Sequence, residues 1–386
     1  MLTALTGARI ITPDRTIDDG VVLIDEGRIV EAGPGVPVPE GAAATDLAGT
    51  TLVPGFVDLH VHGGGGRSLA TREPEELRAY ARWAAERGVT GFLASVLAPT
   101  PEAALPCLEA VARASGPIEG GARLLGAHLE GPYVSPHRRG ALPAPWLHAP
   151  DAALLARYLD AARGNLRVLT LAPELPGADA VLSQAVAAGV VVAVGHTDAT
   201  YEQARAAFQA GARHVTHAFN AMRPFHHRDP GPLAAAIDAP DITLELIADG
   251  VHLHPAAARL LVSAAGPDRV ALVTDAVPPA GAESGAFRLG DADATLEGRR
   301  VTLPDGTIAG GASTMDALVR TVVADGVASL SDAVRMAATV PARVLGLERA
   351  RGRIAPGYDA DLVVLDGEMA VLKTFVGGEL AYSRPQ

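Results

Sequence analysis

The sequence is poor in several residue types, and each scarcity excludes a class of protein. Cys107 is the single cysteine among 386 residues, so no disulfide can form within the chain, and a reducing cytoplasm is the expected compartment. Apolar runs reach only about 5 to 8 residues, far short of the roughly 20 that cross a bilayer, so no membrane partner is expected. The first residues show no basic segment ahead of an apolar one, and we expect no secretion signal.

Positive charge is also scarce. The formal net charge is −12, which disfavours nucleic acid as a partner and means that an anionic substrate would need a local positive pocket. Lys373, near the C-terminus, is the only lysine. The hydrophobic content of 48% is enough for a sizeable core, and 20% charged residues argues against disorder.

Eight short apolar segments, separated by helical stretches, predict a parallel sheet that is buried on both faces. They are Leu52–His62, Gly91–Val96, Leu124–Glu130, Leu166–Ala172, Val190–His196, His214–Phe219, Ile242–Ala248 and Val270–Thr274. The helical stretches carry start signals, such as Pro74 and the capping-box pair Thr200 and Gln203. Cys107 falls in one of them, residues 101–114, as a buried small apolar side chain.

Eight such units over about 290 residues favour a TIM-type (β/α)8 barrel. A doubly wound open sheet is the alternative, but it would not usually gather polar residues at the ends of nearly every strand.

The two ends of the chain have a different pattern. A hairpin is indicated around Glu26-Gly27, and short strands recur over residues 352–386. Neither piece alone is large enough for a stable core. We therefore expect a small β-sandwich domain built discontinuously from residues 1–52 and 345–386, beside a hydrolase barrel over residues 53–344. Another hairpin is predicted at Pro304-Asp305-Gly306.

Polar side chains gather where the predicted strands end, and such barrels carry their chemistry at those ends. The residues are His60, His62, Glu130, His196, His217 and Asp275. Side chains two apart on an extended strand share a face, so His60 and His62 should converge, and the four glycines after them allow a sharp turn. Any one of these residues alone is more often an ordinary polar residue at a strand end. Together they predict a divalent metal, most of all Zn²⁺, with iron, manganese or cobalt as alternatives.

One or two ions per subunit are compatible with this set. Two neighbouring ions need a bridging anion, and a carboxylated lysine is excluded because Lys373 lies outside the predicted barrel. Glu130 is the remaining protein candidate. His128 shares its face of the strand, and we expect it one layer below, as a packing or supporting residue.

Several stretches resemble the amidohydrolase superfamily and, more narrowly, the N-acetylglucosamine-6-phosphate deacetylase family. The resemblance covers nearly the whole chain. It is carried by Pro54-Gly-Phe-Val-Asp-Leu-His-Val-His62, His128-Leu-Glu-Gly-Pro-Tyr133, Val194-Gly-His-Thr-Asp198, Thr216-His-Ala-Phe-Asn-Ala-Met222, Ala248-Asp-Gly-Val-His252 and Leu272-Val-Thr-Asp-Ala276. It implies hydrolysis of the acetamide of an amino sugar phosphate.

The resemblance also implies residue roles. Glu130, His196 and His217 would hold the principal metal, His60 and His62 a second one, and Asp275 would be the acid and base. The substrate would be contacted by Ala141, Asn220, Ala221, Arg228, His252, Ile308, Ala309 and Gly310. Arg228 and His252 would bind the phosphate. In the family this arginine crosses a dimer interface, so the resemblance implies a homodimer in which Arg228 reaches the neighbouring subunit's site.

One departure affects the substrate. Family members commonly have a histidine where this chain has Leu142, and leucine cannot donate to a carbonyl or phosphate. Either His137, His148 or an arginine substitutes, or the affinity or identity of the substrate differs. The galactosamine epimer is therefore an alternative substrate.

More distant alternatives are a cyclic amide hydrolase and a catalytically inactive scaffold. The missing barrel lysine and the stretch around Glu130 oppose the first, and the complete set of six candidate residues opposes the second.

Overall fold

The chain is described by a computed structural model over residues 2–290 and 292–385. Eight parallel strands form the central sheet in the order β15-β14-β13-β12-β11-β10-β9-β6. They are β6 (Phe56–Asp58), β9 (Val89–Val96), β10 (Arg123–Glu130), β11 (Leu166–Leu171), β12 (Val191–Val194), β13 (His214–Val215), β14 (Thr243–Leu246) and β15 (Val270–Leu272). Each of the eight predicted segments overlaps one of them, and β9 and β10 begin two residues and one residue earlier than predicted.

The sheet closes into a barrel just beyond the ends of its first and last strands. Val61 forms a parallel bridge with Ala276, the Asp275 N–H donates to the His60 carbonyl (2.8 Å), and the His62 N–H donates to the Ala276 carbonyl (2.7 Å). The predicted barrel is therefore confirmed. Its closing seam runs between the segments that carry His60 and Asp275, which fixes these two segments side by side.

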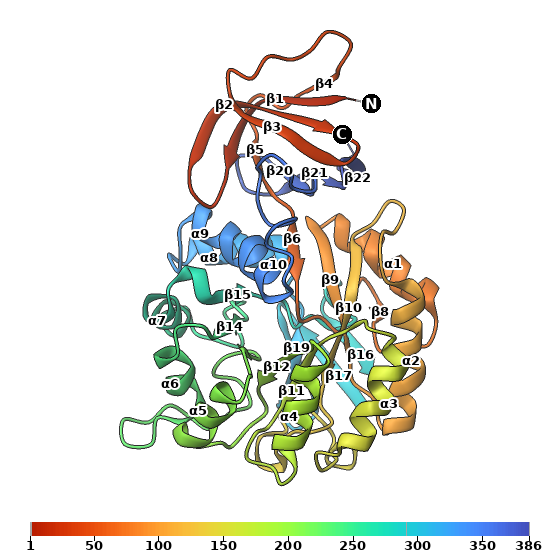
Figure 1. The fold of residues 1–386 in the computed structure, drawn as a ribbon, viewed down its shortest axis with the longest axis vertical. Coiled ribbons are helices and arrows are strands. Elements are labelled where there is room, and N and C mark those ends of the chain that lie inside the picture. The colour runs from red at the N-terminus through yellow and green to blue at the C-terminus, as the bar shows by residue number, and fades with distance from the viewer. Residues whose placement is uncertain (1, 291, 386) are drawn as a thin grey trace.

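Helices surround the barrel (Figure 1). They are α1 (Pro74–Ala85), α2 (Pro101–Ala114), α3 (Ala152–Ala162), α4 (Ala178–Ala187), α5 (Tyr201–Gln209), α6 (Gly231–Asp238), α7 (Pro255–Ala265), α8 (Met315–Ala324), α9 (Leu330–Val334) and α10 (Val340–Val344). Short 3-10 turns cover Pro136–Arg138, Ala144–Trp146 and Pro267–Arg269, and a π-helical turn covers Arg335–Thr339. The capping box at the start of α5 is present in both directions, from Thr200 to Gln203 and back.

The two chain ends pair with each other in one mixed sheet of eight strands at the top of the molecule in Figure 1. The strands are β1 (Thr3–Ile11), β2 (Thr16–Asp25), β3 (Arg28–Pro34), β4 (Ala43–Asp46), β5 (Thr51–Pro54), β20 (Leu362–Leu365), β21 (Val371–Val376) and β22 (Glu379–Ser383). Leu5, Ile24 and Leu52 share a buried cluster with Leu362 and Phe375, so both ends contribute to one core. Lys373 lies on β21, outside the barrel.

The first predicted segment divides at Gly55. Pro54 ends β5 in the terminal sheet, whereas Phe56 begins β6 in the barrel. A Cβ at Gly55 would lie 2.3 Å from Thr90, so only glycine fits this crossing between the two sheets.

Between β15 and α8 along the chain, four strands form an antiparallel sheet. It consists of β16 (Gly285–Leu289), β17 (Ala292–Glu297), β18 (Arg300–Thr302) and β19 (Ile308–Gly311). The predicted hairpin at Pro304 to Gly306 joins β18 to β19, whereas β16 and β17 were not predicted. A two-stranded hairpin, β7 (Gly63–Gly64) with β8 (Arg67–Ser68), follows the His60 segment. Over the described ranges, no helix is long and apolar enough to cross a membrane.

Candidate metal centre

Two groups of three side chains converge at the carboxyl end of the barrel. In the first, the Nε2 atoms of His196 and His217 lie 3.0 Å apart, and each is 3.1 Å from Oε1 of Glu130. In the second, Nε2 of His60 and Nε2 of His62 lie 3.2 Å apart. Ligand atoms within each group lie within 4.8 Å of one another. The structure thus brings all six predicted strand-end residues together.

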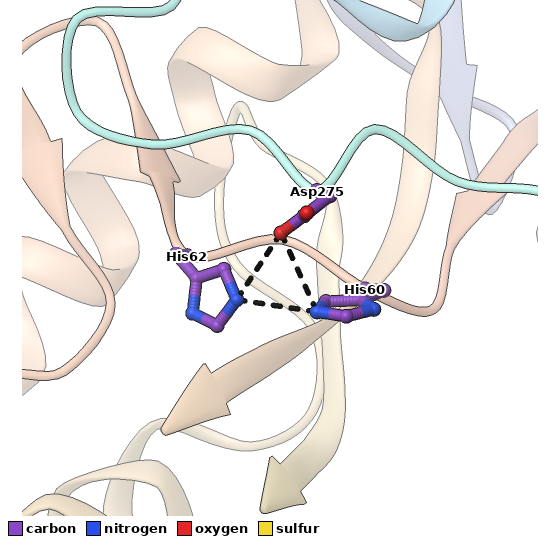
Figure 2. Close-up of side chains that lie close together, drawn as sticks. All are labelled: His60, His62 and Asp275. Atoms are coloured by element: carbon purple, nitrogen blue, oxygen red, sulfur yellow. Dashed lines mark hydrogen bonds and ion pairs between the residues drawn. The ribbon is translucent and has the colours of Figure 1, made fainter. Parts of the chain in front are cut away.

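Asp275 completes the second group (Figure 2). Its Oδ1 lies 3.3 Å from Nε2 of His62 and 3.5 Å from Nε2 of His60. Figure 2 shows the carboxylate directed between the two imidazoles, from the loop that follows β15.

The Glu130 carboxylate contacts both groups. Oε1 faces the ring nitrogens of His196 and His217, and Oε2 lies 3.1 Å from Nε2 of His62. Oε1 is also 3.4 Å from Nε2 of His60. Glu130 would therefore be within reach of an ion held by either group.

The chemistry of the donors fits a cation. Nδ1 of His196 donates to the Arg138 carbonyl (2.9 Å), and Nδ1 of His60 donates to Oε2 of Glu245 (2.9 Å). With the Nδ1 atoms engaged in this way, a neutral ring at either position would present an Nε2 lone pair to the centre, opposite the Glu130 carboxylate. Lone pairs facing one another at about 3 Å are repulsive unless a proton or an ion lies between them. Ligands at 2.0–2.1 Å from a tetrahedral Zn²⁺ are themselves about 3.3 Å apart, close to the observed spacing.

The backbone is unusual at the same residues. His196 (φ 45°), His217 (φ 27°), Ala221 (φ 45°) and Asp275 (φ 46°) all lie in the left-handed region, which non-glycine residues rarely adopt. Strained backbone of this kind concentrates at functional sites. The turns direct the side chains inward from short strands.

The glycines after His62 allow the chain to turn tightly. A Cβ at Gly63 would lie 2.2 Å from the Arg67 carbonyl oxygen, and one at Gly64 would lie 2.3 Å from the Trp83 ring. A side chain at Gly63 would clash with the opposite strand of the hairpin, and one at Gly64 would clash with Trp83 of α1.

Burial and charge together set the protonation of the centre without an ion. Burial lowers the pKa of His62, but hydrogen bonds to Asp275 and Glu130 outweigh it and raise the pKa to about 9. Burial raises the pKa of Asp275, but the charge of His60 outweighs it, so this pKa lies below its ordinary value. The pKa of Glu130 is held well below its usual range by His60, against burial. The carboxylates are therefore ionised and attract cations.

His128 lies behind the centre. Its ring packs edge-on against His60, 4.5 Å between centroids, and its nitrogens bond to Ser95 (3.1 Å) and Thr170 (2.8 Å). Burial, together with the charge of His60, lowers its pKa to about 3, so this ring is neutral.

Two carboxylates beside the centre were not singled out from the sequence. Asp58 accepts hydrogen bonds from the N–H and hydroxyl of Thr274, and burial raises its pKa to about 7. Glu245 is fully buried on β14 and bonds to His60. An acidic residue within an otherwise apolar strand such as Thr243–Leu246 was the available signal.

Most of the predicted substrate residues lie beside the centre. Asn220 and Ala221 form the turn after His217, where the Asn220 amide donates to the His217 carbonyl (3.3 Å). Ile308, Ala309 and Gly310 lie on β19, and the Gly311 N–H donates to the Asp275 carbonyl (2.7 Å). Ala141 packs against the cluster that contains Ala309.

The two predicted phosphate residues differ in burial. His252 donates through Nδ1 to Asp249 (2.8 Å), and its Nε2 lies 3.9 Å from Oδ2 of Asp275, so its ring faces the centre. Arg228 is exposed on the segment between β13 and α6, where Nη1 lies 2.9 Å from His227. Among the described residues, Arg228 bonds to His226 and His227 rather than to the centre.

Leu142 is buried rather than directed to a polar partner. It lines a small cavity with Val96, Leu129 and Trp146, at the edge of which Glu130 lies. The leucine therefore packs the loop over residues 136–147 against β9 and β10. His137 is exposed in the same loop, and Nε2 of His148 is buried without a hydrogen-bond partner among the described residues.

A parallel eight-stranded barrel with clustered histidines and carboxylates at its carboxyl end defines a metal-dependent hydrolase. The profile of the Amidohydrolase family matches residues 51–381, and the chain belongs to this family.

Relatives with named activities align with almost the full length of this chain. The chain is 34% identical to N-acetylglucosamine-6-phosphate deacetylase of Bacillus subtilis, over 97% of this chain and 95% of the relative. It is 36% identical to N-acetylgalactosamine-6-phosphate deacetylase of Escherichia coli O157:H7, over 99% and 100%. A solved structure of a Mycobacterium smegmatis N-acetyl-D-glucosamine-6-phosphate deacetylase variant, in complex with N-acetyl-D-glucosamine-6-phosphate, superposes with a TM-score of 0.91 at 39% identity, covering 99% and 100%.

Proposed function

We propose that this protein hydrolyses the acetamide of N-acetylglucosamine 6-phosphate to glucosamine 6-phosphate and acetate. The observation that carries the proposal is the pair of ligand groups that share Glu130, with Asp275 directed into the second group. The comparisons support the substrate class. The relatives reported above are named for amino sugar phosphates, and they align with nearly the whole chain.

Glu130, His196 and His217 would hold the principal ion, and His60 and His62 would hold a second with Glu130 between them. The buried, ionised carboxylate and nitrogen ligands suit Zn²⁺. Such ions polarise a carbonyl and lower the pKa of water, from 15.7 to about 7 in the best-known case.

Asp275 would act as base and then as acid. Its carboxylate is ionised without an ion, so it can accept a proton from the attacking water. The acetamide carbon becomes tetrahedral, and Asp275 then delivers that proton to the departing amine. One carboxylate thus serves both steps.

The sugar would lie against Asn220, Ala221, Ala141 and β19. Arg228 and His252 would bind the phosphate, and His252 is the closer of the two to Asp275. The exposure of Arg228 supports a homodimer in which it reaches the neighbouring subunit's site. The single, buried Cys107 supports a cytoplasmic location.

A second candidate substrate is N-acetylgalactosamine 6-phosphate. It is favoured by the 36% identity to the deacetylase of that sugar, which the chain matches over the relative's full length. The replacement of the usual histidine by the buried Leu142 is compatible with either epimer.

Acetate release tests both candidates. The purified, zinc-loaded protein is given N-acetylglucosamine 6-phosphate, N-acetylgalactosamine 6-phosphate and unphosphorylated N-acetylglucosamine in parallel. Faster release from the first supports the proposal, and faster release from the second assigns the epimer instead. Poor release from all three would reject both substrates on this centre.

A further inference from the structure

Glu245 is a buried carboxylate to which the proposed chemistry assigns no role. It lies on β14 and is 0% exposed. Oε2 accepts hydrogen bonds from Nδ1 of His60 (2.9 Å) and from the His217 N–H (2.9 Å). Oε1 lies 3.1 Å from Nε2 of His214.

The two donors to Oε2 come from different ligand groups, since His60 belongs to the second group and His217 to the first. His60 follows β6 and His217 follows β13, so a single oxygen connects two segments on opposite sides of β14 and β15. The contact with His60 is made through its ring, whereas the contact with His217 is made through its main chain. Only a bond to the ring fixes which nitrogen carries the proton and where the ligand nitrogen points.

We propose that Glu245 is the positioning residue for the second ion, because it holds the proton of His60 on Nδ1 and aims Nε2 at the centre. The inference rests on the proposed function in one respect, namely that two ions are bound. A negative partner also makes the imidazole a better donor to a metal, which supports affinity as well as geometry.

A purely structural role for Glu245 has a different consequence. A carboxylate that served folding alone would stabilise β13 and β14 through His214 and the His217 N–H. Its loss would then lower stability and weaken both ions alike. The proposal instead requires a selective effect on the ion that His60 binds.

The substitution Glu245→Gln separates the two roles. Glutamine keeps the shape and leaves a neutral oxygen for the His217 N–H, but it removes the negative charge that holds the proton of His60 on Nδ1 and makes Nε2 a stronger metal ligand. Asp361→Asn is the matched control, because it removes another buried carboxylate, in the terminal sheet. Zn²⁺ bound per chain is measured by equilibrium dialysis at graded free Zn²⁺, together with the midpoint of urea unfolding.

We expect Glu245→Gln to weaken one ion by about 10- to 100-fold and to leave the other at wild-type affinity. In a His62→Ala background, where the second site is already impaired, the same substitution should leave the remaining ion unchanged. Wild-type affinity for both ions in Glu245→Gln would overturn the proposal. So would an equal weakening of both ions, or a weaker remaining ion in the His62→Ala background, since either places the effect on His217.

Measuring acetate release by the wild-type protein distinguishes failure of the proposed role of Glu245 from failure of the proposed function. A wild-type chain that releases acetate while binding one ion would overturn the role of Glu245 and leave the deacetylase proposal standing. A wild-type chain with two ions, selective loss in Glu245→Gln and no acetate release would support the role of Glu245 and overturn the proposed substrate.

Discussion

Replacement of Asp275 by asparagine tests the proposed chemistry most directly. Asparagine keeps the size of the side chain and an oxygen near Nε2 of His62, which lies 3.3 Å from Oδ1 in the structure. It cannot accept and return a proton, and positioned acid–base groups contribute about 10²- to 10⁴-fold to a rate. Because the same carboxylate would serve both proton transfers, we expect kcat to fall by about 10³-fold, or about 4 kcal/mol of activation free energy. KM should change little.

Zinc content must be measured on the same samples, by mass spectrometry after dialysis. The principal ion should remain in Asp275→Asn, because Glu130, His196 and His217 are its proposed ligands. Asp18→Asn, an exposed residue on β2 in the terminal sheet, is the control and should retain full activity. If zinc-loaded Asp275→Asn kept more than about a tenth of the wild-type kcat, Asp275 would not be the acid and base, since such groups contribute at least about 10²-fold.

Four further predictions concern the ions, the phosphate and stability. Glu130→Gln should weaken both ions, because its carboxylate contacts both groups and the substitution removes the charge, and retention of either ion at full affinity in dialysis would refute its bridging role. Without an ion, the pKa of His62 is about 9 and that of His60 is also raised, so a second ion displaces protons and its apparent affinity should rise with pH, by at least about tenfold per unit near neutrality. A pH-independent zinc titration would contradict this competition. Arg228→Ala should raise KM for the phosphorylated sugar by about 10- to 100-fold and leave the unphosphorylated sugar unaffected, whereas equal effects on both would exclude a phosphate contact. Thr200→Ala should lower the free energy of unfolding by about 0.5–2 kcal/mol in urea titrations, with activity unchanged, because the cap of α5 is lost.

Short-range patterns in the sequence were reliable guides to the fold. Apolar segments bounded by turns predicted each barrel strand, and the predicted start of α5 at Thr200 agrees with its observed cap. The predicted hairpin at Pro304 to Gly306 was found, but β16 and β17 were missed because they are short and alternate apolar with polar residues, so neither has an apolar run.

The sequence alone determined the class of barrel and the set of residues at its rim, because strand period and residue type are local properties. Convergence of His60 and His62 followed from their spacing. Their proximity to Asp275 did not, because it depends on the seam that closes the barrel between the first and last strands.

Only the tertiary structure decided which carboxylate supports which ring. Glu130 reaches both ligand groups, and Glu245 bonds a histidine 185 residues away along the chain. It also decided that Leu142 is buried beside Val96 of β9 and Leu129 of β10. These contacts depend on strand order, left-handed turns at His196, His217 and Asp275, and burial, and each of these arises when distant segments pack into one core.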